Sequence, residues 1–492
     1  MMLFLPVILP LAAIVLLLFT YRMKRLQQWI SIISMSAITL QAVMIMNRVV
    51  LDGPFAAQAG GWPAPFGITF TADLLSAILL LATGFLSLIV TVYSIGFMDD
   101  TRKTAGFWIL IHGLVTGVNG SFLTGDIFNL YVWFEVMLIS SFVLVTLGAE
   151  RKQLRGAIKY VVLNLIGSVI FLTAIGLMYG QTGTLNMADL ALRLRESEHT
   201  GLINSSLMLF FIAFGIKAAV FPFFFWLPAS YPTPPVAITA FFAGTLTKVG
   251  VYVILRFYNL FVVTDLASWQ IIVMIVAGVT MVSGVLMAAS SYDIRKILSF
   301  HIISQIGYMI MGVGIASVIG LAGAIYFIVH NMLSKTGTFL AAGLIYKYRG
   351  SYDLKALGWI YKDYPLLAFL FLLPALSLAG IPPTPGFFGK FFLIYGGFQA
   401  GAWTITAVAI LVSIITLFSM VKIWNEAVWK KIPDESAARQ KNHLPLTSLW
   451  ATIVMAGLII ALGLLTGYLS EYFFEAGRQL KDVDLYIRTV LH

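Results

Sequence analysis

The residues best suited to chemistry are two lysines inside apolar stretches. Lys217 lies in the run 202–225 and Lys248 in the run 235–259, and each run is long enough to cross a bilayer. A charged side chain near the middle of a membrane costs about 2.5–3.5 kcal/mol on insertion scales, and such residues usually mark ion or proton pathways. The lysines therefore predict a proton or ion path, and the alternative is a lysine that only holds helices together.

A carboxylate in the fifth apolar run is a candidate partner for Lys217. Glu135 ends the stretch Tyr131-Val132-Trp133-Phe134-Glu135 in the run 126–148. Burial disfavours the charge on either group, whereas a neighbouring opposite charge favours it. A Glu135–Lys217 pair could therefore switch between a charged, paired state and a neutral one. The alternative is a permanently paired structural glutamate, and removing its partner would then cost about 3–5 kcal/mol.

Further titratable groups extend this pair into a line. Thr245 and Thr247 lie just before Lys248. His330, Ser334 and Lys335 share the run 321–346, and Lys390 follows Gly386-Phe387-Phe388-Gly389. Histidine suits an intermediate step because its reference pKa is close to neutrality. We expect a lateral proton relay, bridged by water, that consists of Glu135, Lys217, Lys248, His330, Lys335 and Lys390.

Weaker candidates lie near this line. His301, Ser304 and Gln305 near the start of the run 297–316 predict a water-filled proton entrance. His112 is a further entry candidate, although a neutral histidine in the core explains it as well. Asp73 fits an interfacial anchor better than a cation ligand.

The composition places these residues in a membrane. Hydrophobic residues make up 60% of the chain, charged residues 11%, and the mean hydropathy is +0.94, as expected of a polytopic membrane protein in contact with lipid. The absence of cysteine excludes disulfides, zinc–thiolate sites and thiolate-bound iron–sulfur clusters. No P-loop or GxGxxG motif is present, and neither haem nor quinone binding has independent support. We expect no cofactor and no metal site.

About fourteen apolar runs can span the bilayer, so the predicted fold is an all-α polytopic bundle. The expected spans are 3–20, 28–50, 67–97, 105–124, 126–148, 156–179, 202–225, 235–259, 268–289, 297–316, 321–346, 364–398, 402–428 and 446–474.

Basic residues predict how this bundle is oriented. The loops after odd-numbered spans contain most of the lysines and arginines, among them Arg22, Lys24, Arg25, Arg439 and Lys441. By the positive-inside rule these loops are cytoplasmic, and both termini lie on the outer side of a bacterial plasma membrane. The formal charge of +10 therefore reflects topology, and we expect no nucleic acid partner.

Two spans are predicted to be broken. The seventh meets Pro222, and the twelfth meets Pro374 and then Gly380-Ile381-Pro382-Pro383-Thr384-Pro385-Gly386. In lipid such breaks persist only where protein or trapped water satisfies the freed backbone groups. Discontinuous helices at corresponding places in two halves indicate a transport site.

The sequence also contains a weak internal repeat. The stretch 156–164 aligns with 323–331, and in the same register Asp126 aligns with Asp293. The offset of about five spans inverts the second copy. The alignment also pairs Leu163 and Ser168 with His330 and Lys335, and a short gap pairs Lys217 with Lys390. The predicted parts are 1–104 (helices 1–3), 105–260 (first five-helix repeat), 261–430 (second repeat) and 431–492 (cytoplasmic loop, helix 14 and outer tail).

These motifs resemble a known family over about residues 65–430. The family comprises the antiporter-like subunits of respiratory complex I, membrane-bound hydrogenases and Mrp-type multisubunit cation/proton antiporters. The resemblance rests on Phe134-Glu135, the run from Lys217 to Pro235, Asp293-Ile294-Arg295-Lys296, the segment His330 to Lys335, and Gly386 to Lys390. It implies inverted five-helix repeats, Glu135 coupled to Lys217, Lys248 as connector and Lys390 as terminal proton site.

The chain departs from the complex I relatives in one place. A histidine often found before the tryptophan in their Phe-Trp-Leu-Pro motif is here Phe225. The resemblance is strongest to the Mrp-type branch, and implies a subunit that moves H⁺ in a Na⁺/H⁺ antiporter complex with other membrane subunits. A complex I-type or hydrogenase-type pump subunit is the close alternative, and a purely structural subunit is a third hypothesis.

Overall fold

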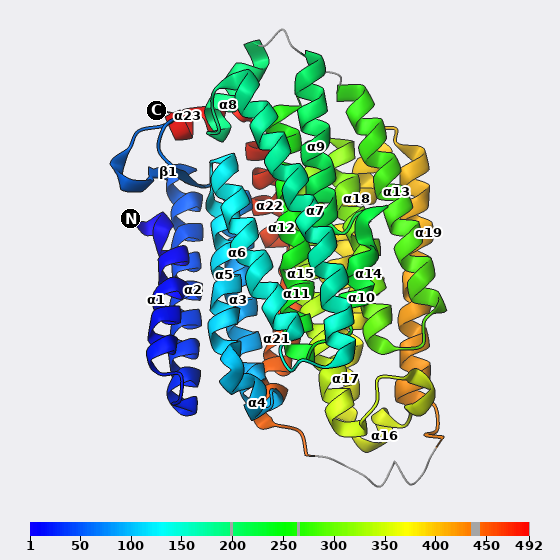
Figure 1. Cartoon of the computed structure of the whole chain (residues 1–492). Helices are drawn as coiled ribbons and strands as arrows, with labels where there is room; N and C mark the ends of the chain where they lie inside the picture. Colours follow the sequence, from blue (N-terminus) through cyan, green and yellow to red (C-terminus); the bar gives the residue numbers. More distant parts are fainter. Residues whose placement is uncertain (197–199, 263–265, 434–442, 492) are drawn as a thin grey trace.

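Long apolar helices stand side by side along most of the chain in this computed structural model (Figure 1). The structure describes all residues except 197–199, 263–265, 434–442 and 492. Thirteen helices in this described part are long and apolar enough to cross a membrane, and a shorter apolar helix, α17, joins them. This confirms the predicted helical bundle. The basic residues Arg439 and Lys441 of the predicted cytoplasmic loop lie outside the described residues.

The helices follow one another along the chain with these bounds. The first half contains α1 (Leu5–Phe19), α2 (Lys24–Asp52), α3 (Leu74–Phe97), α4 (Asp100–Arg102), α5 (Trp108–Leu123), α6 (Ile127–Thr146), α7 (Arg151–Thr182), α8 (Met187–Glu196), α9 (Thr200–Ala218), α10 (Trp226–Ser230), α11 (Val236–Gly244) and α12 (Leu246–Phe261). The second half contains α13 (Leu266–Ser290), α14 (Ile294–Ile315), α15 (Val318–Arg349), α16 (Ile360–Asp363), α17 (Pro365–Ala379), α18 (Pro385–Gln399), α19 (Trp403–Ile423), α21 (Leu446–Leu464), α22 (Thr466–Lys481) and α23 (Val483–Leu491). Short 3-10 or π turns are η1 (Met2–Phe4), η2 (Ala59–Gly61), η3 (Lys103–Phe107), η4 (Phe223–Phe225), η5 (Leu354–Ala356) and η6 (Trp424–Trp429).

Both chain termini lie at the same end of the bundle, which we call the terminal end (Figure 1). A small antiparallel sheet, β1 (Phe55–Gln58) and β2 (Thr69–Ala72), lies there together with α8 and α23. The sequence did not predict these two strands. The opposite end contains α4 and α16 with the lysine- and arginine-rich loops, and we call it the basic end.

Two spans are broken as expected, although one of the prolines named for the twelfth span does not break it. Helix α9 ends at Ala218, and Ala219 has a positive φ of 61° before η4 and α10. Helix α17 runs through Pro374 without ending, so placing a break at that proline was wrong. It ends instead at Ala379, where Gly380 has a φ of 86°, a conformation that glycine adopts without steric cost. A third, unpredicted break separates α11 from α12 at Thr245 (φ −120°, ψ −54°).

Several contacts of the first half recur 167 positions later in the second. Asp126 and Asp293 each cap a helix by accepting a bond from the backbone N–H three residues on. The N–H of Ile127 donates to Leu185 O at 2.9 Å, and the N–H of Ile294 donates to Tyr352 O at 3.0 Å. Asp126 and Asp293 cap α6 and α14, and the next helices along the chain, α7 and α15, both have 32 residues. These matches support the predicted repeat, whose bounds remain a prediction.

Helices α9 and α12 approach each other closely at Gly250, so substitution of this glycine tests how tightly they pack. A methyl group at Gly250 would lie 2.6 Å from the backbone nitrogen of Ala218, whereas one at Gly176 on α7 would meet no atom within 4 Å. We expect Gly250→Ala to lower the free energy of unfolding by about 1–3 kcal/mol through overpacking. Gly176→Ala should be neutral or stabilising by up to about 1 kcal/mol, because alanine favours helix. Thermal unfolding in detergent measures both, and equal effects would contradict the packing.

Candidate functional site

Glu135 and Lys217 are joined through a serine instead of forming the expected direct pair. Ser168 Oγ donates to Glu135 Oε1 at 2.5 Å, and Lys217 Nζ donates to Ser168 Oγ at 3.1 Å. The serine lies on α7, which packs against both α6, carrying Glu135, and α9, carrying Lys217. Lys217 is buried, and its Nζ also lies 3.4 Å from Asn164 O. A hydroxyl can both accept and donate, so the arrangement couples the two charges across one bridging group.

Lys248 lies beside the break between α11 and α12. Its side chain is fully buried, and Nζ donates to Ala243 O at 2.5 Å. Ala243 belongs to the last turn of α11, where helical carbonyls lack a partner within the helix. The break thus supplies an acceptor for the ammonium group. The Thr247 hydroxyl is also buried and has no hydrogen-bond partner among the described residues.

Glycine contacts bring the neighbouring segments together on both sides of Lys248. On one side Gly250 faces Ala218, the residue after Lys217. On the other, a methyl group at Gly244 would lie 2.5 Å from Thr336 Oγ1, the residue after Lys335. Thr336 Oγ1 also donates to Ala240 O at 3.2 Å, which fixes α15 against α11. The contacts of Thr336 with Gly244 and Ala240 thus join the two halves of the bundle next to Lys335.

Helix α15 carries the next two groups. His330 Nδ1 lies 3.2 Å from Ser334 Oγ and 3.1 Å from Ser377 Oγ on α17. Lys335 Nζ donates to Leu298 O on α14 at 3.3 Å. All of these side chains are fully buried. Ser377, which contacts His330, directly precedes Leu378, whose carbonyl accepts from Lys390, so His330 and Lys390 meet the same end of α17.

Lys390 reaches back across the break in the twelfth span. Its Nζ donates to Leu378 O at 3.1 Å, Ala379 O at 2.9 Å and Ser413 Oγ at 2.9 Å. It belongs to α18, after the break, whereas Lys217 precedes the break in its span. Counted from the helix ends Ala218 and Ala379, Lys217 is the last residue but one of α9, and Leu378 is the last residue but one of α17. By this count Lys217 corresponds to Leu378 and not to Lys390. The ammonium group of Lys390 returns to the Leu378 carbonyl, and the correspondence of Lys217 with Lys390 stays a prediction.

The candidate entry residues divide into two groups. His301 Nε2 lies 2.9 Å from Ser419 Oγ, and Lys335 and Lys390 act electrostatically on His301. His301 Nδ1, Ser304 Oγ and both amide atoms of Gln305 are buried without a hydrogen-bond partner among the described residues, so these atoms could bind water. His112 Nδ1 instead donates to Trp108 O at 2.7 Å within its own helix, and its Nε2 is buried without a partner among the described residues.

The sequence analysis missed the hydroxyl and amide groups between the charges. These are Ser168, Ser377 and Ser413, which bond to the titratable groups, and Asn331, whose buried amide has no partner within the described residues. The repeat contained a signal for Asn331, because its counterpart is Asn164, whose carbonyl lies next to Lys217. No three His, Asp or Glu side chains of the described part lie together as a metal site would require.

The sequence model of the family described as NADH:quinone oxidoreductase/Mrp antiporter, transmembrane, matches residues 124–416, more than half of the chain. The chain belongs to this family. Among family members, the D-type Na⁺/H⁺ antiporter subunit of Alkalihalophilus pseudofirmus is 40% identical over 487 residues, 99% of this chain and 98% of that protein. Its counterpart in Bacillus subtilis is 36% identical over 488 residues, again 99% and 98%.

Two solved structures have a similar fold. A chain in the Mrp complex from Dietzia sp. DQ12-45-1b has a TM-score of 0.93 and 31% identity, covering 100% of this chain and 99% of that one. A chain in respiratory complex I from Thermus thermophilus has a TM-score of 0.85 at 22% identity, covering 98% and 99%, which shows a common fold. The resemblance to the Mrp-type branch expected from the motifs is thus confirmed.

The serine bridge generates a prediction about energetic coupling. If Ser168 joins Glu135 to Lys217, then Ser168→Ala and Lys217→Met together should change the free energy of unfolding non-additively, by about 0.5–3 kcal/mol. Ser168→Ala combined with Lys390→Met should be additive, because the partners of Ser168 and of Lys390 are on different helices. Thermal unfolding of the single and double variants measures both cycles. Additivity in the first cycle would show that the serine does not couple the charges.

Proposed function

We propose that this chain moves hydrogen ions through a buried Glu/Lys/His relay as one subunit of a multisubunit Na⁺/H⁺ antiporter. It is a transporter component and not an enzyme, as its relatives are named antiporter subunits. The observation that carries the proposal is the series of contacts from Glu135 through Ser168 to Lys217, and from there across α12 and α15 towards Lys390. Glu135, Ser168 and Lys217 are joined by hydrogen bonds. Beyond Lys217 the contacts are made by residues near the titratable groups: Ala218 lies against Gly250, Gly244 lies against Thr336, and Ser377, which bonds to His330, precedes Leu378, whose carbonyl bonds to Lys390.

Electrostatic repulsion would drive the transfer. None of the ion pairs in the described part of the chain joins Lys248, Lys335 or Lys390 to a carboxylate. Two like charges in a low-dielectric interior repel strongly, so a hydrogen ion arriving on one lysine raises the free energy of a charge on the next. Glu135 provides the negative charge that holds a hydrogen ion on Lys217, through Ser168. His301, Ser304 and Gln305 would form the entrance, and Lys390 with Ser413 the terminal site.

Two other functions remain distinguishable. The chain could serve as a redox-driven pump subunit, as in complex I or a membrane-bound hydrogenase, but relatives that are 40% and 36% identical are named antiporter subunits. It could also be purely structural, with no relay. In that case, removal of a buried charge would affect assembly and transport to the same extent.

Removing the first two charges should separate these functions. In the assembled complex, Lys217→Met and Glu135→Gln should abolish Na⁺-dependent H⁺ flux into vesicles while leaving the complex intact, and Lys390→Ala should impair it through loss of the terminal site. Lys159→Met, which changes an exposed lysine on α7, is the matched control and should exchange normally. Normal flux in both the Lys217 and Glu135 variants would refute the relay, and loss of assembly in both would favour the structural role.

The orientation of the bundle belongs to the same proposal. The terminal end would face outward and the basic end the cytoplasm, as the positive-inside rule indicates. The chain contains no cysteine, so single cysteines can be labelled without background. Phe66→Cys lies in the loop between β1 and β2, where Phe66 is 88% exposed, and Ala356→Cys lies in the exposed turn η5. A membrane-impermeant maleimide should label the first in intact cells and the second only after permeabilisation. The reverse pattern would invert the topology.

A further inference from the structure

Helix α12 carries a polar stripe from the middle of the bundle to the terminal end. Lys248, Tyr252 and Arg256 are spaced by four residues and therefore lie on one face of the helix. The eight residues from Lys248 to Arg256 span about 12 Å along the axis. All three side chains are buried. A route along this stripe would lead from a proposed relay group to the solvent at the terminal end.

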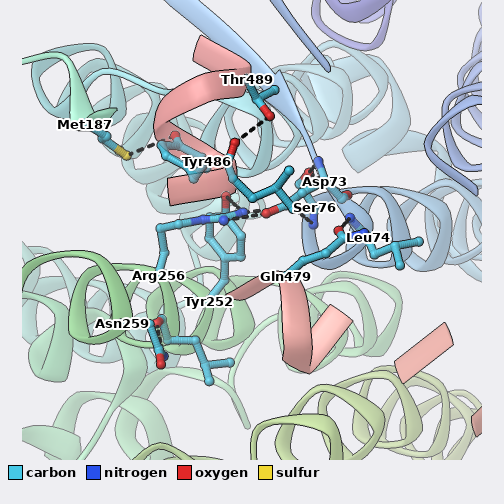
Figure 2. Close-up of polar contacts among 12 residues, drawn as sticks. Asp73, Leu74, Ser76, Met187, Tyr252, Arg256, Asn259, Gln479, Tyr486 and Thr489 are labelled. Atoms are coloured by element: carbon cyan, nitrogen blue, oxygen red, sulfur yellow. Dashed lines mark hydrogen bonds and ion pairs between the residues drawn. The ribbon is translucent and has the colours of Figure 1, made fainter. Parts of the chain in front are cut away.

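The stripe ends in a closed ion pair (Figure 2). Arg256 Nη1 lies 2.5 Å from Asp73 Oδ2, and Nη2 lies 2.9 Å from Oδ1, so the guanidinium occupies both carboxylate oxygens. The two side chains are 4% and 8% exposed, respectively. Tyr252 Oη accepts a long bond of 3.4 Å from Arg256 and donates to Phe122 O at 2.8 Å. Asp73 is thus an anchor, as the sequence indicated, but its partner Arg256 was not foreseen.

The C-terminal segment covers this pair. The ring of Tyr486 on α23 lies 5.3 Å from the guanidinium carbon of Arg256, and Gln479 on α22 accepts from the N–H of Leu74 at 3.1 Å (Figure 2). On the far side of α23, Asp484 pairs with Arg195 of α8 at 2.6 Å. The ion pair is therefore held under a lid fixed to both α3 and α8.

The Asp73–Arg256 pair is unsuited to passing a hydrogen ion along α12. An arginine cannot be deprotonated in a protein, so it cannot hand a hydrogen ion on. Both oxygens of Asp73 accept bonds from it, and its adjacent positive charge disfavours protonation of the carboxylate. The fixed positive charge also repels a hydrogen ion approaching along the stripe.

We propose that Asp73 and Arg256 form a plug that keeps hydrogen ions on Lys248 from leaking along α12 to the terminal end. Because of the plug, hydrogen ions on Lys248 pass across the bundle by way of α15 to Lys390 and do not leave along α12 to the terminal end. This inference rests on the proposed role of Lys248 as a relay group.

The test measures H⁺ leak in vesicles that contain the assembled complex and no Na⁺ gradient. Asp73→Asn combined with Arg256→Gln removes both charges without stranding either, and Arg256→Lys keeps the charge but cannot hold both oxygens in the same way. We expect the double variant to raise the leak at least about tenfold, which corresponds to removing about 1.4 kcal/mol of barrier. The lysine variant should raise it less.

Three controls decide the origin of any leak. Arg349→Gln with Asp363→Asn neutralises another buried pair at the basic end and should leave the vesicles tight. Adding Lys248→Met to the double variant should restore tightness, because the stripe loses its inner member. A leak that persists there, or tight vesicles for both plug variants, would overturn the proposal. Lys248→Met alone tests the relay separately: normal Na⁺-dependent exchange in that variant would refute the role of Lys248, whatever the state of the plug.

Discussion

The rest of the structure depends on the need to give every buried ammonium group an acceptor in a medium without bulk water. The chain meets this need with backbone carbonyls. Lys248 bonds to the last turn of α11, and Lys390 bonds to the last two carbonyls of α17. Both acceptors exist because a helix ends there inside the bundle. At these two breaks the helix end and the buried lysine are thus two parts of one arrangement, because the lysine bonds to carbonyls that have no partner within the helix. Lys217 differs, since it bonds to Ser168 and Asn164 on α7.

The two halves of the bundle differ in the charged groups that lie near their buried lysines. In the first half a carboxylate balances one lysine through Ser168, whereas the equivalent position in the second half is Lys335. The second half therefore concentrates Lys335, Lys390 and His330 among neutral serines. A repeat with identical charges would have no electrostatic gradient along its length. The difference between Ser168 and Lys335 gives the line a negative beginning and a positive end, which is the asymmetry that the proposed directional transfer needs.

Sequence reasoning located what depends on composition and local chemistry, and failed where tertiary contacts decide. Hydropathy was enough for the spans, and the proline- and glycine-rich stretch 380–386 correctly indicated the twelfth break. Pro374 lies inside α17, which continues to Ala379. A helix within a membrane tolerates a proline where neighbouring groups satisfy the freed carbonyl, and the local sequence does not show whether they do. The break at Thr245 has no proline and left little local signal. The bridge through Ser168 needs α7 between α6 and α9, and nothing in the local sequence specifies that placement.

The exposure of Glu135 connects the site to the assembly. Lys217 is almost fully buried, but Glu135 is only partly buried within the single chain, on the side of the bundle formed by α6 and α7. Several apolar side chains of α7, including Ile158, Val162 and Val169, are exposed on the same helix. A carboxylate in contact with lipid would be costly, whereas a neighbouring protein surface could provide it with polar partners. The line of polar groups thus begins at an edge that is incomplete in the isolated chain, which agrees with the multisubunit complex in which a close structural match was solved.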